Sequence, residues 1–464
     1  MTKQRCEGPG RPNVVLMVMH DLGDYLGCYG RQVQSPNLDR FAQEGARFTK
    51  HFCASPFCSP SRGSIITGQY PHTHGLMGLC NLGWDLPGRA MTDAKRFESA
   101  GYRTCLVGFQ HEKRKHADLG FQIDLGNRFL ASSNYATDYV AECAGEVLGA
   151  FAEKQRRGEH TPFYMRIGSY SVHRTLDPVS GSYGYEPMHG RGLAESEVDI
   201  LPQWMDTPGL RFDLAGFTGE VRNMDRGIGL VLDAIRDSGL EDNTLVIFTT
   251  DHGIDFPRAK GTLYDLGTQT ALMMRYPGRI SAGTTVSGLS SHVDILPTLL
   301  EFCGIPATPE IQGRSLLSLI NGPYSSVRDH VFAEESTFPG NVMRAIRTNR
   351  FKLIRNFIRG PRSNALTNSR TRTVMDTGRF YFVNRPEYEL YDLITDPNEL
   401  VNVSEKSEYR EIEIPLREQL RQWLIETNDP VLTNAIERPV DEYDLFPGDR
   451  DARNEHAKCL WEIS

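Results

Sequence analysis

Strand-like apolar runs alternate with helical patterns over the first two-thirds of this chain. The strand-like runs end in polar residues or glycine and lie at 14–19, 105–109, 163–170 and 243–253. Between them, 36–45 is opened by proline and closed by glycine, and 219–239 repeats apolar residues at helical spacing. Strand, helix and strand in repetition predict an α/β fold with a large, mostly parallel or mixed sheet sandwiched between helices.

The pattern changes after residue 335. Short strand candidates and one long helix then follow, at 343–349, 350–357, 388–393 and 407–426. Consecutive short strands without intervening helices predict a smaller α+β domain built on an antiparallel sheet.

We therefore expect two domains, a catalytic one over 1–335 and the smaller one over 336–464. Within the second domain, the polar stretch 359–378 is predicted to be a long surface loop, and the tail from residue 437 is acidic and loop-like. The loop and the tail are candidate contacts for a homo-oligomer, which the sequence leaves open.

Composition limits the kinds of partner that the chain can bind and indicates its cellular compartment. The 464 residues carry a net charge of −8, which argues against a nucleic-acid partner because phosphate binding needs a surplus of Lys and Arg. The longest apolar run is too short to cross a membrane, and the N-terminus has no apolar signal segment. The nine cysteines are odd in number and contain no CxxC pair, so neither a disulfide framework nor a zinc ribbon is predicted. We expect a cytoplasmic protein.

Two pairs of polar residues stand where predicted strands stop. His20 and Asp21 follow the first apolar run, and Asp251 and His252 follow the run at 243–253. In parallel sheets, ligands gather beyond the carboxyl ends of the strands. A single pair of this kind is as readily a hydrogen-bonded turn, but two such pairs favour a metal or ligand site.

The segment CSPSRG, which begins at Cys58, carries the most specific chemistry. Pro60 suits the first turn of a helix, and the free N–H groups of that turn form an anion site. Arg62 adds a forked cation suited to a sulfuryl or phosphoryl oxyanion, and a thiol at a helix N-terminus is acidified. The alternative is a buried cysteine beside a helix cap; the intact C-x-P-S-R pattern favours a reactive residue.

CSPSRGSIITG resembles the signature of the type I, formylglycine-dependent sulfatases of the alkaline phosphatase superfamily. The likeness extends over RPNVVLMVMHDLG, SPNLDRFAQEGARF, GQYPHTHG, NTLVIFTTDHG, AKGTLYDLG and YELYDLITDPNELVN. Within the family it is strongest to the sulfamidases (N-sulfoglucosamine sulfohydrolases), on the segments MDRGIGLVLDAIRDSGLEDNTLVIFTTDHGIDFP, SVHR and WLIETNDP. The resemblance implies that a formylglycine-generating enzyme oxidises Cys58 to an aldehyde, whose hydrate is a geminal diol. One hydroxyl attacks sulfur, and the other later expels sulfate.

The resemblance also implies a set of site residues. The metal ligands would be Cys58 in its modified form together with His20, Asp21, Asp251 and His252. Three further positions match catalytic roles in the family: His111 as the base that deprotonates the formylglycine hemiacetal, His173 as general acid, and Lys260 on the sulfate and leaving-group oxygen.

This chain departs from the family pattern at the metal. Histidine stands at 20 and 252, where the family usually has Asp and Asn, and imidazole shifts preference from calcium toward manganese, zinc or iron. One divalent metal is expected (Mn, Ca, Zn or Mg), with Mn or Zn favoured over Ca.

A second departure lies before His111, where the family's G-K-x-H reads Gly-Phe-Gln-His, so a sulfate-binding lysine is absent. Gln110, Arg174 and Lys113 are candidates to replace it. His74, in YPHTHG, lies in a predicted loop and either lines the substrate pocket or is structural.

Two principal functions follow. The leading one is a sulfatase for a small anionic substrate, an N- or O-sulfated sugar or another organosulfate. The alternative is a phosphonate monoester or phosphodiester hydrolase on the same scaffold, because an aromatic residue before His111 and an Asp-His metal pair also resemble that group. A non-catalytic metal-binding relative is disfavoured by the intact set Cys58, Arg62, His111, His173 and Lys260.

Overall fold

The computed structural model describes most of the chain. The described residues are 11–126, 137–176, 183–185, 192–322, 325–338, 340–359, 369–371, 384–433, 435–437 and 439. The predicted loop at 359–378 and the tail from 437 lie almost entirely outside them. Among the described helices, none is both long enough and apolar enough to span a membrane.

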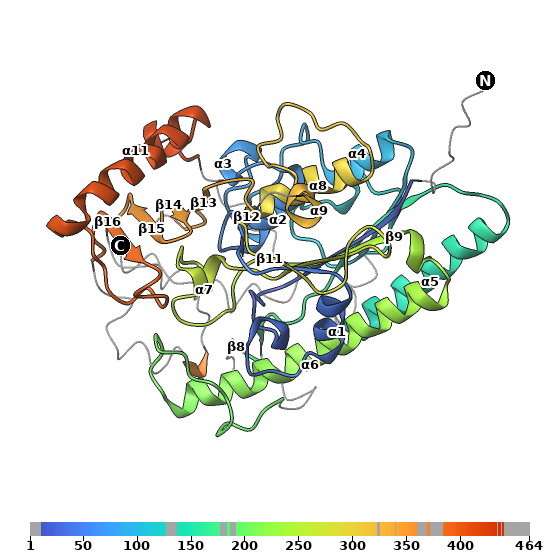
Figure 1. Ribbon diagram of the computed structural model, residues 1–464, viewed down its shortest axis with the longest axis horizontal. Helices are drawn as coiled ribbons and strands as arrows, with labels where there is room; N and C mark the ends of the chain where they lie inside the picture. The colour runs from blue at the N-terminus through green and yellow to red at the C-terminus, as the bar shows by residue number, and fades with distance from the viewer. Residues whose placement is uncertain are drawn as a thin grey trace.

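The larger part of the molecule is built on a mixed sheet of eight strands (Figure 1). Its centre is parallel: β1 (Asn13–Met19) lies between β9 (Thr244–Thr250) and β6 (Phe163–Gly168), and β4 (Arg103–Gly108) follows β6. The remaining strands complete the order β11-β2-β10-β9-β1-β6-β4-β5, with bounds Thr284–Val286 (β11), Ala46–Phe48 (β2), Leu272–Arg275 (β10) and Ile123–Asp124 (β5). Since β10 runs antiparallel to its two neighbours, the predicted mostly parallel or mixed sheet is confirmed.

Helices cover both faces of this sheet because the side chains of β1 alternate between two cores. Val15, Met17 and Met19 pack with α1 (Pro36–Glu44), α5 (Thr137–Arg156) and α6 (Pro208–Asp237). Val14, Leu16 and Val18 pack against the opposite layer. That layer comprises α2 (Cys58–Thr67), α4 (Asp93–Ser99), α8 (Ile295–Phe302) and α9 (Leu317–Asn321). Figure 1 shows the two helical layers on either side of the sheet.

The smaller domain is an antiparallel sheet of four strands covered by one long helix. The strands are β13 (His330–Glu335), β14 (Met343–Thr348), β15 (Phe351–Asn356) and β16 (Tyr388–Asp392), in chain order. Helix α11 (Arg410–Glu426) packs Leu420, Trp423 and Leu424 against this sheet. The predicted α+β domain is confirmed. Its first strand, β13, lies on the catalytic side of the expected boundary at 335, and the boundary itself stays a prediction.

A buried polar cluster joins the two domains. His72, in the short helix α3 (Pro71–His74), contacts the Glu334 carboxylate of β13 through Nδ1 and lies 3.5 Å from Asp429. Arg344 of β14 pairs with Asp429 through two hydrogen bonds of 2.6 and 2.9 Å. The positive charge of Arg344 already neutralises one of the two carboxylates, those of Glu334 and Asp429. We therefore assign this cluster to holding the two domains together.

Two helical segments differ from the predictions. The helix predicted at 219–239 is the second half of α6, which begins at Pro208 after the Thr207 cap. Its first half buries Asp213 and Gly216, which interrupt the apolar spacing, so hydrophobic periodicity does not reveal this part of the helix. The YPHTHG segment, predicted to be a loop, contains the single helical turn α3.

Candidate active site

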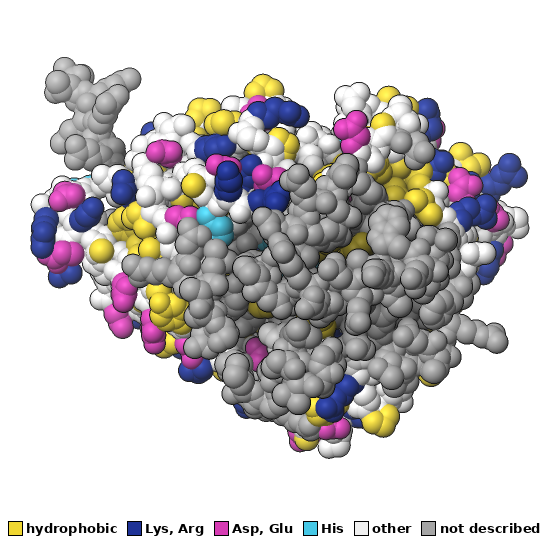
Figure 2. Space-filling model, turned by 180° about the vertical axis from the view of Figure 1, so that it is seen from behind, with side chains coloured by type: hydrophobic (Ala, Val, Ile, Leu, Met, Phe, Trp, Pro, Cys, Tyr) yellow, Lys and Arg dark blue, Asp and Glu magenta, His cyan; other side chains and the backbone are white. Residues whose placement is uncertain are grey.

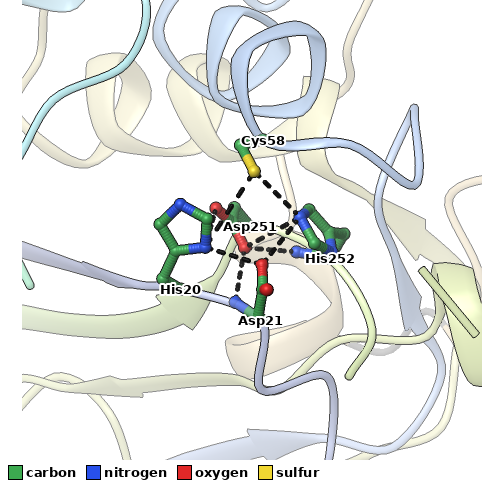
Figure 3. A group of neighbouring side chains, drawn as sticks. All are labelled: His20, Asp21, Cys58, Asp251 and His252. Carbon is green, nitrogen blue, oxygen red and sulfur yellow. Dashed lines mark hydrogen bonds and ion pairs between the residues drawn. The ribbon is translucent and has the colours of Figure 1, made fainter. Parts of the chain in front are cut away.

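Five potential ligand side chains converge at the carboxyl edge of the large sheet (Figure 3). His20 and Asp21 follow β1, and Asp251 and His252 follow β9. Because Met19 and Thr250 are directly paired across these parallel strands, the two turns lie side by side. Cys58 enters from the opposite side as the first residue of α2. Potential ligand atoms of all five lie within 4.8 Å of one another, and all five residues are buried.

Short contacts define the centre of the cluster. Asp21 Oδ1 lies 2.6 Å from His20 Nδ1 and 3.1 Å from His252 Nε2, and its Oδ2 lies 2.6 Å from Lys260 Nζ. Cys58 Sγ is 3.3 Å from His252 Nε2. Asp21 has a φ of +50°, so this non-glycine residue adopts the left-handed conformation in the turn that carries its carboxylate into the cluster.

The cluster favours positive charge. Burial opposes the charged imidazole of His20, yet Asp251, Cys58 and Asp21 together raise its pKa to about 9. Burial likewise opposes ionisation of Asp21, but Lys260 and the surrounding histidines hold its pKa well below the usual value. His252 donates Nδ1–H to the Gly253 carbonyl at 2.8 Å, which leaves Nε2 facing the cluster. Two carboxylates and two imidazoles that converge in a buried, cation-attracting site fit a divalent metal.

The surroundings of Cys58 stabilise a negative charge at its Sγ position. Burial disfavours the thiolate, but His20, Lys260 and His252 lower the pKa of the thiol well below its usual value. A side-chain hydrogen bond from His111 acts in the same direction. Any oxygen nucleophile at this position would meet the same electrostatic environment, which suits an attacking oxyanion.

The Arg62 side chain is held by contacts within the protein. It donates Nε–H to the Asp251 carboxylate at 2.9 Å and Nη2–H to the Met19 carbonyl at 3.2 Å, and its contact with an anion stays a prediction. The Phe109 ring lies 5.1 Å from its guanidinium carbon. Arg62 is 2% exposed, and these contacts make it a support for the turn that carries Asp251.

The predicted histidines and lysine lie around the cluster. His173 Nε2 is 3.8 Å from Asp21 Oδ2, and its Nδ1–H donates to the Arg174 carbonyl. Burial and the neighbouring Lys260 lower the pKa of His173 to about 3. His111 Nδ1 is buried and has no hydrogen-bond partner among the described residues. The structure thus brings His111, His173 and Lys260 to the surroundings of Cys58.

Arg174 and Gln110, two candidates to replace the missing sulfate-binding lysine, are engaged by other groups of the protein. Arg174 is 1% exposed, pairs with Asp213 at 3.0 Å and lies over the rings of Tyr185 and Phe256. The Oε1 atom of Gln110 accepts hydrogen bonds from the backbone N–H groups of Glu112 and Lys113, and its Nε2 donates to the Lys113 carbonyl. In both cases burial and internal pairing indicate a structural role, and substrate binding by these two residues stays a prediction.

Lys113 and His74 are also tied into the fold. Lys113 Nζ contacts Asp85 at 3.2 Å and the Leu86 carbonyl. His74 accepts the Leu76 N–H at Nδ1, and its Nε2 lies 3.3 Å from the Pro60 carbonyl. Burial lowers the pKa of His74 to about 3, so the ring is neutral. These contacts favour the structural alternative for His74, and its place in the substrate pocket stays a prediction.

Sequence reasoning missed two groups of residues beside the site. Tyr170 packs its ring against His20 and His173, with centroids 5.5 and 4.6 Å apart, and forms an aromatic wall with Phe109. Ser61 and His292 form a buried polar link behind Cys58. Tyr170 could have been suspected from its place three residues before His173, but His292 carries no local signal.

Comparison with known proteins gives the family. The family model described as "Sulfatase" matches residues 12–305, and that described as "N-sulphoglucosamine sulphohydrolase, C-terminal" matches 256–372. The N-sulphoglucosamine sulphohydrolase of Homo sapiens is 28% identical over 477 residues, which cover 90% of this chain and 91% of that relative.

Two solved structures share the fold. One is a protein solved in complex with its substrate D-glucosamine-2-N,6-O-disulfate. It has a TM-score of 0.68 and 23% sequence identity, and the match covers 90% of this chain and 98% of that protein's chain. The other is a phosphonate monoester hydrolase from Silicibacter pomeroyi, with a TM-score of 0.65 and 20% sequence identity. That match covers 93% of this chain and 100% of the hydrolase chain. The fold is that of sulfatases and their relatives. The chain itself belongs to the sulfatase family and is a sulfuric ester hydrolase.

Proposed function

We propose that this sulfatase removes sulfate from a small N- or O-sulfated sugar, with Cys58 acting as formylglycine beside a divalent metal. The observation that carries the proposal is the position of Cys58: a buried side chain at the start of α2, 3.3 Å from His252 and surrounded by cationic groups. The match of 256–372 to the C-terminal model of N-sulphoglucosamine sulphohydrolase, and the names of the relatives, support a sulfated amino sugar.

His20, Asp21, Asp251 and His252 would hold the metal. Bound there, it would polarise the nucleophile and one sulfate oxygen. Conversion of Cys58 supplies a hydrated aldehyde, in which one hydroxyl attacks sulfur while the other later releases sulfate. Arg62 keeps the Asp251 carboxylate in place, and Lys260 is fixed by Asp21 at 2.6 Å as a charged contact for the transferring group.

Proton donation to the leaving group falls to His173. Its side chain is 19% exposed, whereas that of Asp21 is fully buried, so the imidazole lies at the open side of the cluster. The lowered pKa keeps the ring neutral in the free enzyme. A bound anion raises the pKa of His173, because a nearby negative charge favours the imidazolium. Substrate binding therefore favours the protonated form of His173 that acts as the general acid.

The substrate we favour is small, and a local pocket rather than an extended basic surface would recognise it. On the face seen in Figure 2, Lys and Arg side chains are interspersed with Asp and Glu over the described surface and form no single basic patch. An anion there would meet few concentrated positive charges, whereas at Cys58 it would meet Lys260 and the metal that the buried cluster would hold.

Rates on three substrates test this function. We expect an aryl sulfate and glucosamine N-sulfate to be hydrolysed faster than a phenyl phosphonate monoester, with mass spectrometry showing the Cys58 sulfur replaced by oxygen. A phosphonate hydrolysed much faster than every sulfate would instead support the second candidate, which is favoured by Phe109 and by the Asp251-His252 pair. An unmodified thiol in fully active enzyme would contradict the formylglycine mechanism.

Two imidazole ligands predict a transition metal. After chelation, we expect Mn²⁺ or Zn²⁺ to restore more activity than Ca²⁺, because calcium prefers an all-oxygen site. His20→Asp should move the preference back toward Ca²⁺. Metal affinities measured by calorimetry, for the native chain and this variant, check the prediction without relying on turnover. An unchanged order of affinities would contradict the role of His20.

A further inference from the structure

A buried polar network lies behind the helix that carries Cys58. His292 begins the turn η7 (His292–Asp294), and its Nδ1 lies 2.9 Å from Ser61 Oγ of α2. Ser61 Oγ also contacts the backbone carbonyl of Asp251. On the other side of the ring, His292 Nε2 lies 3.2 Å from Thr270 Oγ1. His292, Ser61 and Asp251 are fully buried, and Thr270 is 1% exposed.

The donor and acceptor of each of these three hydrogen bonds follow from the chemistry of the groups. A carbonyl oxygen can only accept, so the Ser61 hydroxyl donates its hydrogen to Asp251. Ser61 Oγ must then accept from His292, which places a proton on Nδ1. Burial lowers the pKa of His292 to about 3, so the ring is neutral, and Nε2 accepts from the Thr270 hydroxyl. This tautomer of His292 satisfies its contacts with both Ser61 and Thr270.

The network completes a two-point attachment of α2 to the Asp251 turn. Arg62 binds the Asp251 carboxylate at 2.9 Å, and Ser61, the preceding residue, binds the carbonyl of the same residue. With only one of these bonds, the turn could pivot about it. Cys58 lies three residues before Ser61 and four before Arg62, so all three side chains share one side of the helix.

We propose that His292 is a positioning residue of the sulfatase reaction: by orienting the Ser61 hydroxyl onto the Asp251 carbonyl, it fixes the Cys58 helix against the turn that carries Asp251 and His252. The contact that depends on this alignment is the one between Cys58 Sγ and His252 Nε2, at 3.3 Å. The inference rests on the proposed function, because it assumes that these residues hold the metal and the nucleophile.

Variants of the link test the inference. His292→Leu and Ser61→Ala should each lower kcat and weaken divalent-metal affinity by about 10- to 100-fold, the range typical of residues that orient metal ligands, with KM little changed. His292→Asn keeps an N–H near the Nδ1 position and should recover most of the loss. The double variant should be no worse than Ser61→Ala alone, since both changes break the same link.

The matched control is Ser64→Ala. It removes a second buried hydroxyl from α2, one that faces the Pro60 carbonyl and His74 instead of Asp251, and it should leave kcat and metal affinity unchanged. Conversion of Cys58 is confirmed by mass in every variant. If His292→Leu does not fold, the comparison of Ser61→Ala with Ser64→Ala decides the question.

The inference is overturned if His292→Asn is as impaired as His292→Leu, if the double variant shows additive losses, or if Ser61→Ala matches the control. Failure of the proposed function has a different signature. In that case the native enzyme hydrolyses a phosphonate monoester faster than every sulfate, or is fully active with an unmodified Cys58 thiol, while the variants can still be ranked by the calorimetric affinity for Mn²⁺.

Discussion

Cys58→Ser is expected to stop turnover after a single event. A serine hydroxyl in the same buried, cation-lined position can attack sulfur, but it lacks the second hydroxyl that expels sulfate from the diol-derived ester. We expect steady-state kcat to fall by roughly 10⁴- to 10⁶-fold, the loss typical when a nucleophile is removed. A sulfated form of the protein should accumulate and be visible by mass spectrometry after incubation with an aryl sulfate.

Cys58→Ala is the matched control for this trapping experiment. It should lose kcat to a similar extent, but it has no oxygen at this position and should form no sulfated species. The serine variant is first checked by mass, to establish that the serine itself is unmodified. Multiple turnovers by an unmodified serine enzyme would show that release of sulfate needs no second hydroxyl.

The sequence was sufficient to predict the fold and the centre of the site because both depend on local patterns. Alternating runs such as the one that forms β1 predicted the sheet, and its partner β9 placed Asp251 and His252 beside His20 and Asp21. Two polar pairs at the ends of neighbouring parallel strands must meet at the same edge of the sheet. The boundaries of α6 were missed where glycines and Asp213 interrupt the helical spacing.

The roles of individual side chains were harder to predict, because they depend on partners far away in the chain. Arg62 was expected to face an anion, yet its carboxylate partner Asp251 lies 189 positions later. His292 contacts Ser61 across 231 positions, and nothing in either segment indicates the pairing. Residue type and spacing identify which groups can do chemistry, whereas the packing decides which atoms are already engaged.

Gln110 and Arg174 illustrate the same limit. Each stands within two residues of a histidine that lies at the site, so proximity in sequence suggested that they bind substrate. In the structure, the Gln110 amide binds its own turn and the Arg174 guanidinium faces Asp213. A side chain one position from an active-site residue often points into the core, and only its burial and its partners reveal this.

Asp251→Asn is expected to have the second-largest effect. The Asp251 carboxylate accepts hydrogen bonds from Arg62 Nε–H and from the Asp21 backbone N–H, both at 2.9 Å, and lies 3.5 Å from His20 Nδ1. An amide of the same shape removes one negative charge and leaves the buried Arg62 cation without its ionic partner. We expect divalent-metal affinity to fall by more than the roughly 10- to 100-fold typical of residues outside the ligand shell, and kcat to fall with it.

The control for this substitution is Asp213→Asn, which makes the same chemical change at a buried carboxylate that pairs with Arg174 outside the cluster. It should cost stability, because Arg174 loses the nearer of its two carboxylate partners and keeps only Asp255, while metal affinity measured by calorimetry stays close to that of the native protein. Comparison of the two variants separates the loss of a buried ion pair from the loss of a ligand. Equal metal affinities for the two variants would mean that Asp251 supports the fold and does not bind the metal.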